Sequence, residues 1–182
     1  MSTLKVDAIT NTSGGSSIAG VGIIKSYACI VDAKDDNSDA GVFTNGAWRT
    51  RDLNLEVADT DGIVSLSSNQ FTLGAGTYLI RWTCPAVQVN GHQSRLYSVT
   101  DSAALQNGHA SYAGNISGGA ESRSVMSFRY TVSGSKTFEI QHRCVVTSGG
   151  TWGLGAATSG GINWNSGSDT IIYTIVEIFK EA

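Results

Sequence analysis

Residues 70–82, QFTLGAGTYLIRW, decide the fold predicted for this chain. After a glycine-rich turn, one set of large apolar residues alternates with a second set that contains a charge. The first set is Tyr78, Ile80 and Trp82, and the second is Leu79 and Arg81. Successive side chains of a strand point to opposite faces of its sheet, so this strand needs cover on both faces. We expect Trp82 in a sandwich core and Arg81 toward an interface, where it requires a carboxylate or carbonyl partner.

The composition favours an all-β protein of one domain. The chain has 182 residues, of which 22 are glycine, 1 is proline and 15% are charged. Many glycines and few charges are typical of short strands and tight turns, and this length suffices for one ordinary core. The cysteines Cys29, Cys84 and Cys144 lie among apolar neighbours and are expected to be free structural thiols.

Charge and hydropathy narrow the range of partners. The formal net charge of -3 and the scattered Lys and Arg residues argue against nucleic-acid binding. No apolar run approaches the ~20 residues that a membrane-spanning helix needs, and residues 1–10 lack the apolar core of a signal peptide. We therefore expect no membrane insertion and synthesis in a cytoplasm.

Strand-like runs separated by turn residues continue along the chain, with no helical period between them. The predicted strands are 24–33, 45–54, 62–67, 70–73, 77–89, 94–101, 124–132, 136–147 and 170–180. Their spacing, without βαβ units, predicts an antiparallel sandwich or jelly roll over residues 23–182. Residues 1–22 hold too few apolar groups for a core and are interpreted as an N-terminal arm that a partner or neighbouring subunit holds.

The last predicted strand has apolar residues of both parities. Tyr173 and Ile175 share one face, whereas Ile172 and Val176 share the other. Monomers seldom expose a large apolar patch, so a second subunit is expected to cover one face and to close a homo-oligomer. The alternative is a larger sandwich with a loop folded over that face. Interface or core positions are therefore expected at Tyr78, Ile80, Arg81, Trp82, Tyr173 and Ile175.

A family resemblance rests on the same strand. The spacing of Phe71, Gly76, Tyr78, Ile80 and Trp82 resembles the central strand signature of complement globular heads and their tumour necrosis factor relatives. The apolar strand 170–180 is similar to the last strand of that family. The resemblance implies an antiparallel jelly roll that forms a homotrimer with its inner sheet around a three-fold axis.

A second resemblance concerns the N-terminus. Residues 1–10, MSTLKVDAIT, followed by Asn, Thr, Ser and Gly, are similar to the starts of bacteriophage tail-fibre and virion tail proteins. Residues 52–63 and 136–144 also resemble the heads of such proteins. The resemblance implies a virion protein, made in the host cytoplasm, whose N-terminal arm contacts other virion proteins.

Catalytic signals are sparse. The motifs GxSxG, HExxH and CxxC are absent, and no dinucleotide loop is complete. His142 alternates with apolar residues and is expected to be a buried or interface histidine. Carboxylates that could supply a glycosidase pair also fall around turns, where Asp is favoured; they are Asp52, Glu56, Asp59 and Asp61. We expect a non-enzymatic protein without a cofactor, with a glycan hydrolase as the less favoured alternative.

A weak calcium signal precedes the second predicted strand. Asp35, Asn37 and Asp39 imitate the start of a calcium loop, but the glycine comes one place late and Gly46 stands where the bidentate Glu should be. A solvated turn is the preferred interpretation, and no metal is expected.

Aromatic residues in polar, glycine-rich segments are the predicted ligand contacts, because their rings stack on apolar sugar faces while amides take hydroxyls. They are Trp152, Trp164 and Tyr112, together with Asn163 and Asn165. The alternative is that these side chains fold back as lids on the sandwich, which is the preferred interpretation for Trp48.

The sequence thus predicts a trimeric virion head or tail fibre that recognises a host-surface glycan or protein. A capsid decoration or tail connector protein that makes only protein contacts is the alternative from a different functional class.

Overall fold

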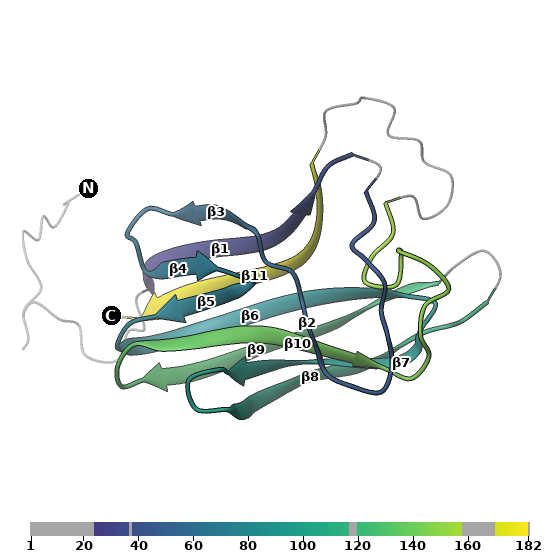
Figure 1. Ribbon diagram of the computed structural model, residues 1–182. Coiled ribbons are helices and arrows are strands. Elements are labelled where there is room, and N and C mark those ends of the chain that lie inside the picture. Colours follow the sequence, from purple (N-terminus) through teal and green to yellow (C-terminus); the bar gives the residue numbers. More distant parts are fainter. Residues whose placement is uncertain (1–23, 37, 117–119, 158–169, 182) are drawn as a thin grey trace, which may run out of the picture.

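The computed structural model describes residues 24–36, 38–116, 120–157 and 170–181, which form two antiparallel sheets packed face to face (Figure 1). The predicted N-terminal arm, residues 1–22, lies outside the described residues. None of the described residues is helical, so no helix among them is long and apolar enough to cross a membrane. The predicted all-β antiparallel class is confirmed.

The first sheet, sheet A, has the strand order β3-β1-β11-β6-β9. Its strands are β1 (Ile24–Lys34), β3 (Leu55–Asp59), β6 (Gly76–Val87), β9 (Glu121–Val132) and β11 (Ile171–Glu181). Every neighbouring pair is antiparallel, and β11 lies between β1 and β6. A strand with apolar residues of both parities is therefore central in its sheet.

The second sheet, sheet B, has the order β4-β5-β10-β7-β8, and β2 pairs with β10 beside this path. Its strands are β2 (Arg49–Thr50), β4 (Val64–Ser67), β5 (Gln70–Leu73), β7 (Asn90–Ser98), β8 (Ala103–Ala113) and β10 (Lys136–Cys144). The chain passes repeatedly from one sheet to the other, which is the connectivity of a jelly roll.

Residues 70–82 make one of these passages, because β5 belongs to sheet B and β6 to sheet A (Figure 1). Gly76 opens β6 at φ +154°, a conformation that an L side chain rarely adopts, and a Cβ there would meet Lys180 Cε at 3.0 Å. The Tyr78 hydroxyl donates a 3.1 Å hydrogen bond to the Gly74 carbonyl across the turn. Glycine and tyrosine together hold the corner between the sheets.

The core lies between the two sheets and follows the alternation of their strands. In β6 the side chains of Tyr78, Ile80 and Trp82 are buried, while Arg81 between them is exposed. Facing core positions from sheet B come from β5, β7 and β10; they are Phe71, Leu73, Leu96, Phe138 and Ile140. The rings of Phe71 and Phe138 lie 5.6 Å apart between centroids.

The strand predicted over residues 45–54 was wrong, and β3 was not predicted. The strand expected over 45–54 is only the short β2, followed by a connecting segment and then β3. Asn54 explains the interruption, since its side-chain amide both accepts from the Ala33 nitrogen and donates to the Ala33 oxygen, each at 2.8 Å. The side chain thus replaces the backbone of a strand partner beside β1.

The strand β8 was missed altogether. Its sequence, AALQNGHASYA, contains four Ala, one Gly and one Asn, which have low β propensity. Pairing with β7 along its length imposes the extended conformation at the edge of sheet B. Tyr112, predicted to lie in a loop, is therefore near the end of this edge strand.

Candidate functional site

The outward face of sheet A is the candidate interface. Backbone pairing aligns its side chains into rows that cross the sheet. One row runs from β3 to β9 through Leu55, Val31, Ile175, Thr83 and Val125. Its two ends are exposed apolar groups, with Leu55 43% and Val125 44% accessible. A second row consists of Tyr27, Phe179, Leu79 and Arg129.

A polar row separates the two apolar rows. It contains Cys29, Glu177, Arg81 and Ser127. Arg81 Nη1 lies 3.6 Å from Glu177 Oε2, and the Tyr27 hydroxyl donates to the other carboxylate oxygen at 3.4 Å. The partner that Arg81 was predicted to require is therefore on the neighbouring strand of the same sheet.

The structure divides the predicted interface-or-core residues between the two faces of sheet A. Tyr78, Ile80 and Trp82 lie in the core, and the Trp82 indole donates to Ser94 Oγ at 2.8 Å. Arg81 and Ile175 lie on the outward face. Tyr173 lies two residues before Ile175 in β11 and therefore points to the same face, but it is buried. Its hydroxyl donates to the Ser38 carbonyl at 2.7 Å.

The predicted aromatic ligand contacts do not gather in one place. Trp152 is half-buried, and its indole donates to Gln88 Oε1 at 3.0 Å. Tyr112 is 68% exposed on β8. Trp164, Asn163 and Asn165 lie outside the described residues.

One of the candidate calcium residues, Asp39, stabilises a loop. Asp39 accepts hydrogen bonds from Thr151 Oγ1 at 2.6 Å and from the Ala157 nitrogen at 2.9 Å, so its carboxylate ties two segments together. Asn37 lies outside the described residues. Within the described ranges, no group of His, Cys, Asp and Glu side chains is arranged to hold a metal ion.

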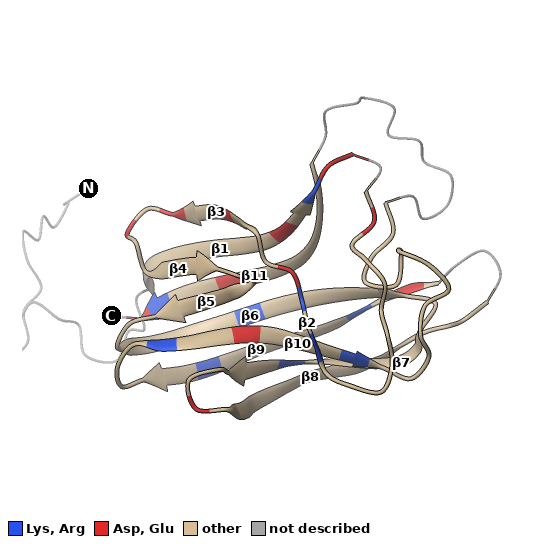
Figure 2. Cartoon of the chain, in the orientation of Figure 1, with Lys and Arg blue, Asp and Glu red and all other residues tan. Residues whose placement is uncertain are grey.

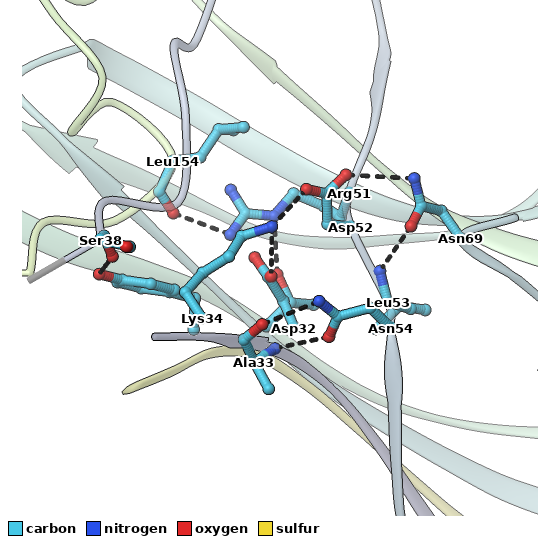
Figure 3. Close-up of polar contacts among 12 residues, drawn as sticks. Asp32, Ala33, Lys34, Ser38, Arg51, Asp52, Leu53, Asn54, Asn69 and Leu154 are labelled. Carbon is cyan, nitrogen blue, oxygen red and sulfur yellow. Dashed lines mark hydrogen bonds and ion pairs between the residues drawn. The ribbon is translucent and has the colours of Figure 1, made fainter. Parts of the chain in front are cut away.

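Two of the four carboxylates considered for a glycosidase, Asp59 and Asp52, are also engaged structurally. Asp59 accepts from the Ile63 and Val64 nitrogens at 2.8 Å each and closes the turn between β3 and β4. Asp52 pairs with Lys34 at 2.7 Å and accepts from Asn69 at 3.1 Å (Figure 3). These contacts match the preference of Asp for turns and connections.

Behind this connection lies a fully buried guanidinium that the sequence analysis did not single out. Arg51 has no exposed surface and donates to Thr174 Oγ1 at 2.7 Å and to the Leu154 carbonyl at 2.8 Å (Figure 3). Its partners come from β11 of sheet A and from the loop after β10, so one side chain links a strand of sheet A to that loop. Burial raises the pKa of the nearby Asp32 carboxyl above its usual range.

His142 is buried, and it pairs with a second histidine. His92 Nδ1 lies 2.9 Å from His142 Nε2, and His92 Nε2 lies 2.7 Å from Ser122 Oγ. Burial, together with the positive charge of Arg51, lowers the pKa of His92 to about 4 and lowers the pKa of His142 well below its ordinary value. Both imidazoles are therefore neutral at pH 7, inside the sandwich.

Another group that the sequence did not reveal lies on the outward face of sheet B. Trp48 precedes β2, which pairs with β10, and its indole is flanked by two guanidinium groups. Arg95 Cζ is 4.1 Å and Arg143 Cζ is 4.7 Å from the ring centroid. These residues are far apart in sequence, and the pairing of β2, β10 and β7 unites them.

Comparison with known proteins identifies the fold. No protein-family profile and no curated protein matches the sequence. The structure of murine APRIL at pH 5.0 is 8% identical, with a TM-score of 0.51 over 85% of this chain and 98% of that chain. Murine APRIL at pH 8.0 is 10% identical, with a TM-score of 0.50 over the same shares. The globular domain of zebrafish complement 1qA protein is 14% identical, with a TM-score of 0.49 over 85% of this chain and 96% of that chain.

The chain therefore has a jelly roll of the tumour necrosis factor and complement globular head type, as the central strand signature indicated. At these identities the likeness concerns the fold alone.

Proposed function

We propose that the chain is the non-enzymatic head of a bacteriophage virion protein, which forms a homotrimer through sheet A and recognises a host-surface ligand. The observation that carries the assembly is the outward face of sheet A. Its apolar rows include exposed Leu55 and Val125, and the rings of Tyr27 and Phe179 lie 5.0 Å apart between centroids. Burial of such rows against a second copy removes apolar surface from water.

The polar row is compatible with burial in this trimer. A charge that enters an interface is tolerated when it keeps a partner, and Arg81 already has Glu177 beside it. Glu177 in turn accepts from Tyr27. Each subunit thus brings its own charge compensation to the interface.

The virion assignment rests on the sequence resemblance of residues 1–10, 52–63 and 136–144 to phage tail proteins. On this proposal the arm, residues 1–22, attaches the head to other virion proteins, and the protein resides in the virion after synthesis in the host cytoplasm. Repetition of one weak site in a trimer raises overall avidity, so recognition of a host surface needs no deep pocket.

Light scattering on the full chain tests the assembly, and we expect the mass of a trimer. A folded monomer at micromolar concentration would contradict it. Binding to host cells then tests recognition. Binding to purified capsids or tails, with none to cells, would favour the decoration or connector protein instead, and release of reducing ends from host polysaccharide would favour the hydrolase.

A further inference from the structure

We infer that the outward face of sheet B carries a binding site for a carboxylate-bearing sugar, centred on Trp48, Arg95 and Arg143. The inference names the ligand class for the host recognition proposed above and rests on that proposal for its cellular role. Three features support the site itself: the stacked side chains, their unused hydrogen-bond donors and the hollows beside them.

The stacking orients the guanidinium groups. Arg95 and Arg143 both stack on the Trp48 indole, and Arg95 Cζ is also 5.1 Å from the Tyr97 ring centroid. Cation–π contact holds a guanidinium over a ring through its flat face. The N–H groups at its edge remain available for an acceptor.

Much of that donor capacity is unused by the protein. Arg95 Nε donates to Gln141 at 2.7 Å, and Arg143 Nη2 donates to Gln93 at 3.0 Å. Among the described residues, the Arg95 Nη atoms and the Arg143 Nε and Nη1 atoms form no hydrogen bond. None of the ion pairs among the described residues involves Arg95, Arg143 or the nearby Arg49. Charge-assisted bonds to a carboxylate would use these donors.

Two hollows adjoin Arg143. One, of about 400 Å³, is lined by residues that include Gly91, Gln93, Ala110 and Val145. The other, of about 340 Å³, is lined by Gly46, Ala47, Trp48 and Cys144. Arg143 lines both, and each volume is within the range of small-ligand pockets.

Two neighbouring strands, β7 and β8, contribute the small residues Gly91 and Ala110 to the lining of the first hollow. Gly91 has no side chain, and a Cβ there would lie 3.2 Å from Val145 Cγ2. The residue paired with Gly91 on β8 is Tyr112, whose side chain is 68% exposed. An exposed aromatic ring beside the hollow offers an apolar surface for stacking, while Gln93 offers an amide for a hydroxyl.

The surrounding charges favour a small acid over a polyanion. Glu139 lies on the same face but is buried and engaged by the Gln70 and Gln141 amides. The blue segments of β2 and of the end of β10 stand out in Figure 2 in a chain whose net charge is -3. A local cationic site with an aromatic neighbour suits a sugar carboxylate, whereas a nucleic acid needs an extended basic surface.

The site faces away from the proposed trimer interface, because sheet A and sheet B form opposite sides of the sandwich (Figure 1). In the trimer every copy would therefore remain open to solvent. Repetition of the site supplies the avidity on which the proposed attachment depends.

Calorimetric titration of the full chain tests the site with oligosaccharides that end in glucuronic, galacturonic or sialic acid. Each has a control in which the carboxyl group is reduced to an alcohol. We expect at least one acidic probe to bind and its reduced form to bind about tenfold more weakly or not at all. Arg143→Gln should weaken binding to a similar extent, whereas Arg123→Gln, a change at an exposed arginine of sheet A, should leave it unchanged.

Binding by none of the acidic probes, or equal binding by Arg143→Gln and the unchanged protein, would overturn the inference. Circular dichroism and light scattering on each variant verify its fold and mass. Cell binding that Arg143→Gln leaves intact would overturn the site and spare the proposed function. Probe binding by a protein that does not bind cells would support the site and contradict host recognition.

Discussion

Arg81 of β6 and Glu177 of β11 are direct cross-strand partners on the outward face of sheet A, with Nη1 and Oε2 3.6 Å apart. The pair lies between two rows of mostly apolar side chains, so any subunit that covers those rows also covers the pair. The proposed interface can therefore be tested by changing the charges of this pair.

Reversal of one charge should dissociate the trimer. Arg81→Glu places like charges on paired positions, and their repulsion strengthens as the interface excludes water. We expect the trimer to weaken at least about tenfold, measured by light scattering across a dilution series. The double change Arg81→Glu with Glu177→Arg should recover most of the trimer, and Arg143→Glu on sheet B is the matched control. A trimer that tolerates Arg81→Glu would place the contact elsewhere.

Substitutions at two neighbouring residues of β6 should separate the effect on trimer assembly from the effect on subunit stability. Ile80 is fully buried, so Ile80→Ala should lower the free energy of unfolding by about 2–5 kcal/mol. Leu79 lies on the outward face, and Leu79→Ala should weaken the trimer while costing the isolated subunit roughly 1 kcal/mol or less. Denaturant titration at low protein concentration measures the first effect, and light scattering measures the second. Equal loss of subunit stability in both variants would argue against the assignment of faces.

Removal of the buried guanidinium should be costly. Arg51→Met leaves the Leu154 carbonyl and Thr174 without their donor, and it removes one of the two positive charges near the buried Asp32, the other being Lys34. We expect the free energy of unfolding to fall by about 3–5 kcal/mol. Arg51→Lys should restore little, since an ammonium cannot reach both acceptors in the same geometry. Denaturation of both variants at pH 7 measures this, and a loss below ~1 kcal/mol would show that Arg51 is dispensable.

The buried histidines should make stability depend on pH. The pKa of His92 is lowered to about 4 from its model-compound value of 6.5, chiefly by burial. Below pH 6.5 His92 is therefore protonated in the unfolded chain, whereas in the folded chain it is protonated only below about pH 4. The contribution of neutral His92 to the free energy of unfolding is fully present above pH 6.5. It falls by roughly 2 kcal/mol as the pH is lowered toward 4. Denaturation at pH 7, 5.5 and 4.5 should show a smaller loss in His92→Gln, and parallel pH profiles would contradict the effect.

Prediction from sequence succeeded where the information was local. The alternation in residues 77–89 identified β6, and the mixed parity of 170–180 identified a strand with two apolar faces. Prediction failed at β8, because its conformation depends on β7 as a partner rather than on its own propensities. It failed in 45–54 because a side-chain amide of Asn54 takes the place of a strand at β1.

The candidate site on sheet B was beyond sequence reasoning for a similar reason. Trp48, Arg95 and Arg143 are separated by long stretches of chain, and nothing in their local sequence links them. Strand register places Arg95 opposite Gln141 and Arg143 opposite Gln93, and β2 lies on the other side of β10. Only this arrangement brings both guanidinium groups onto the Trp48 indole.

By itself, the sequence determined that QFTLGAGTYLIRW turns sharply and continues as a strand with an apolar and a mixed face, because side-chain direction in an extended chain is a local property. Only the tertiary structure decided which face is which. Packing against sheet B assigned Tyr78, Ile80 and Trp82 to the core, and pairing with β11 supplied Glu177 for Arg81. Both outcomes depend on strands far along the chain.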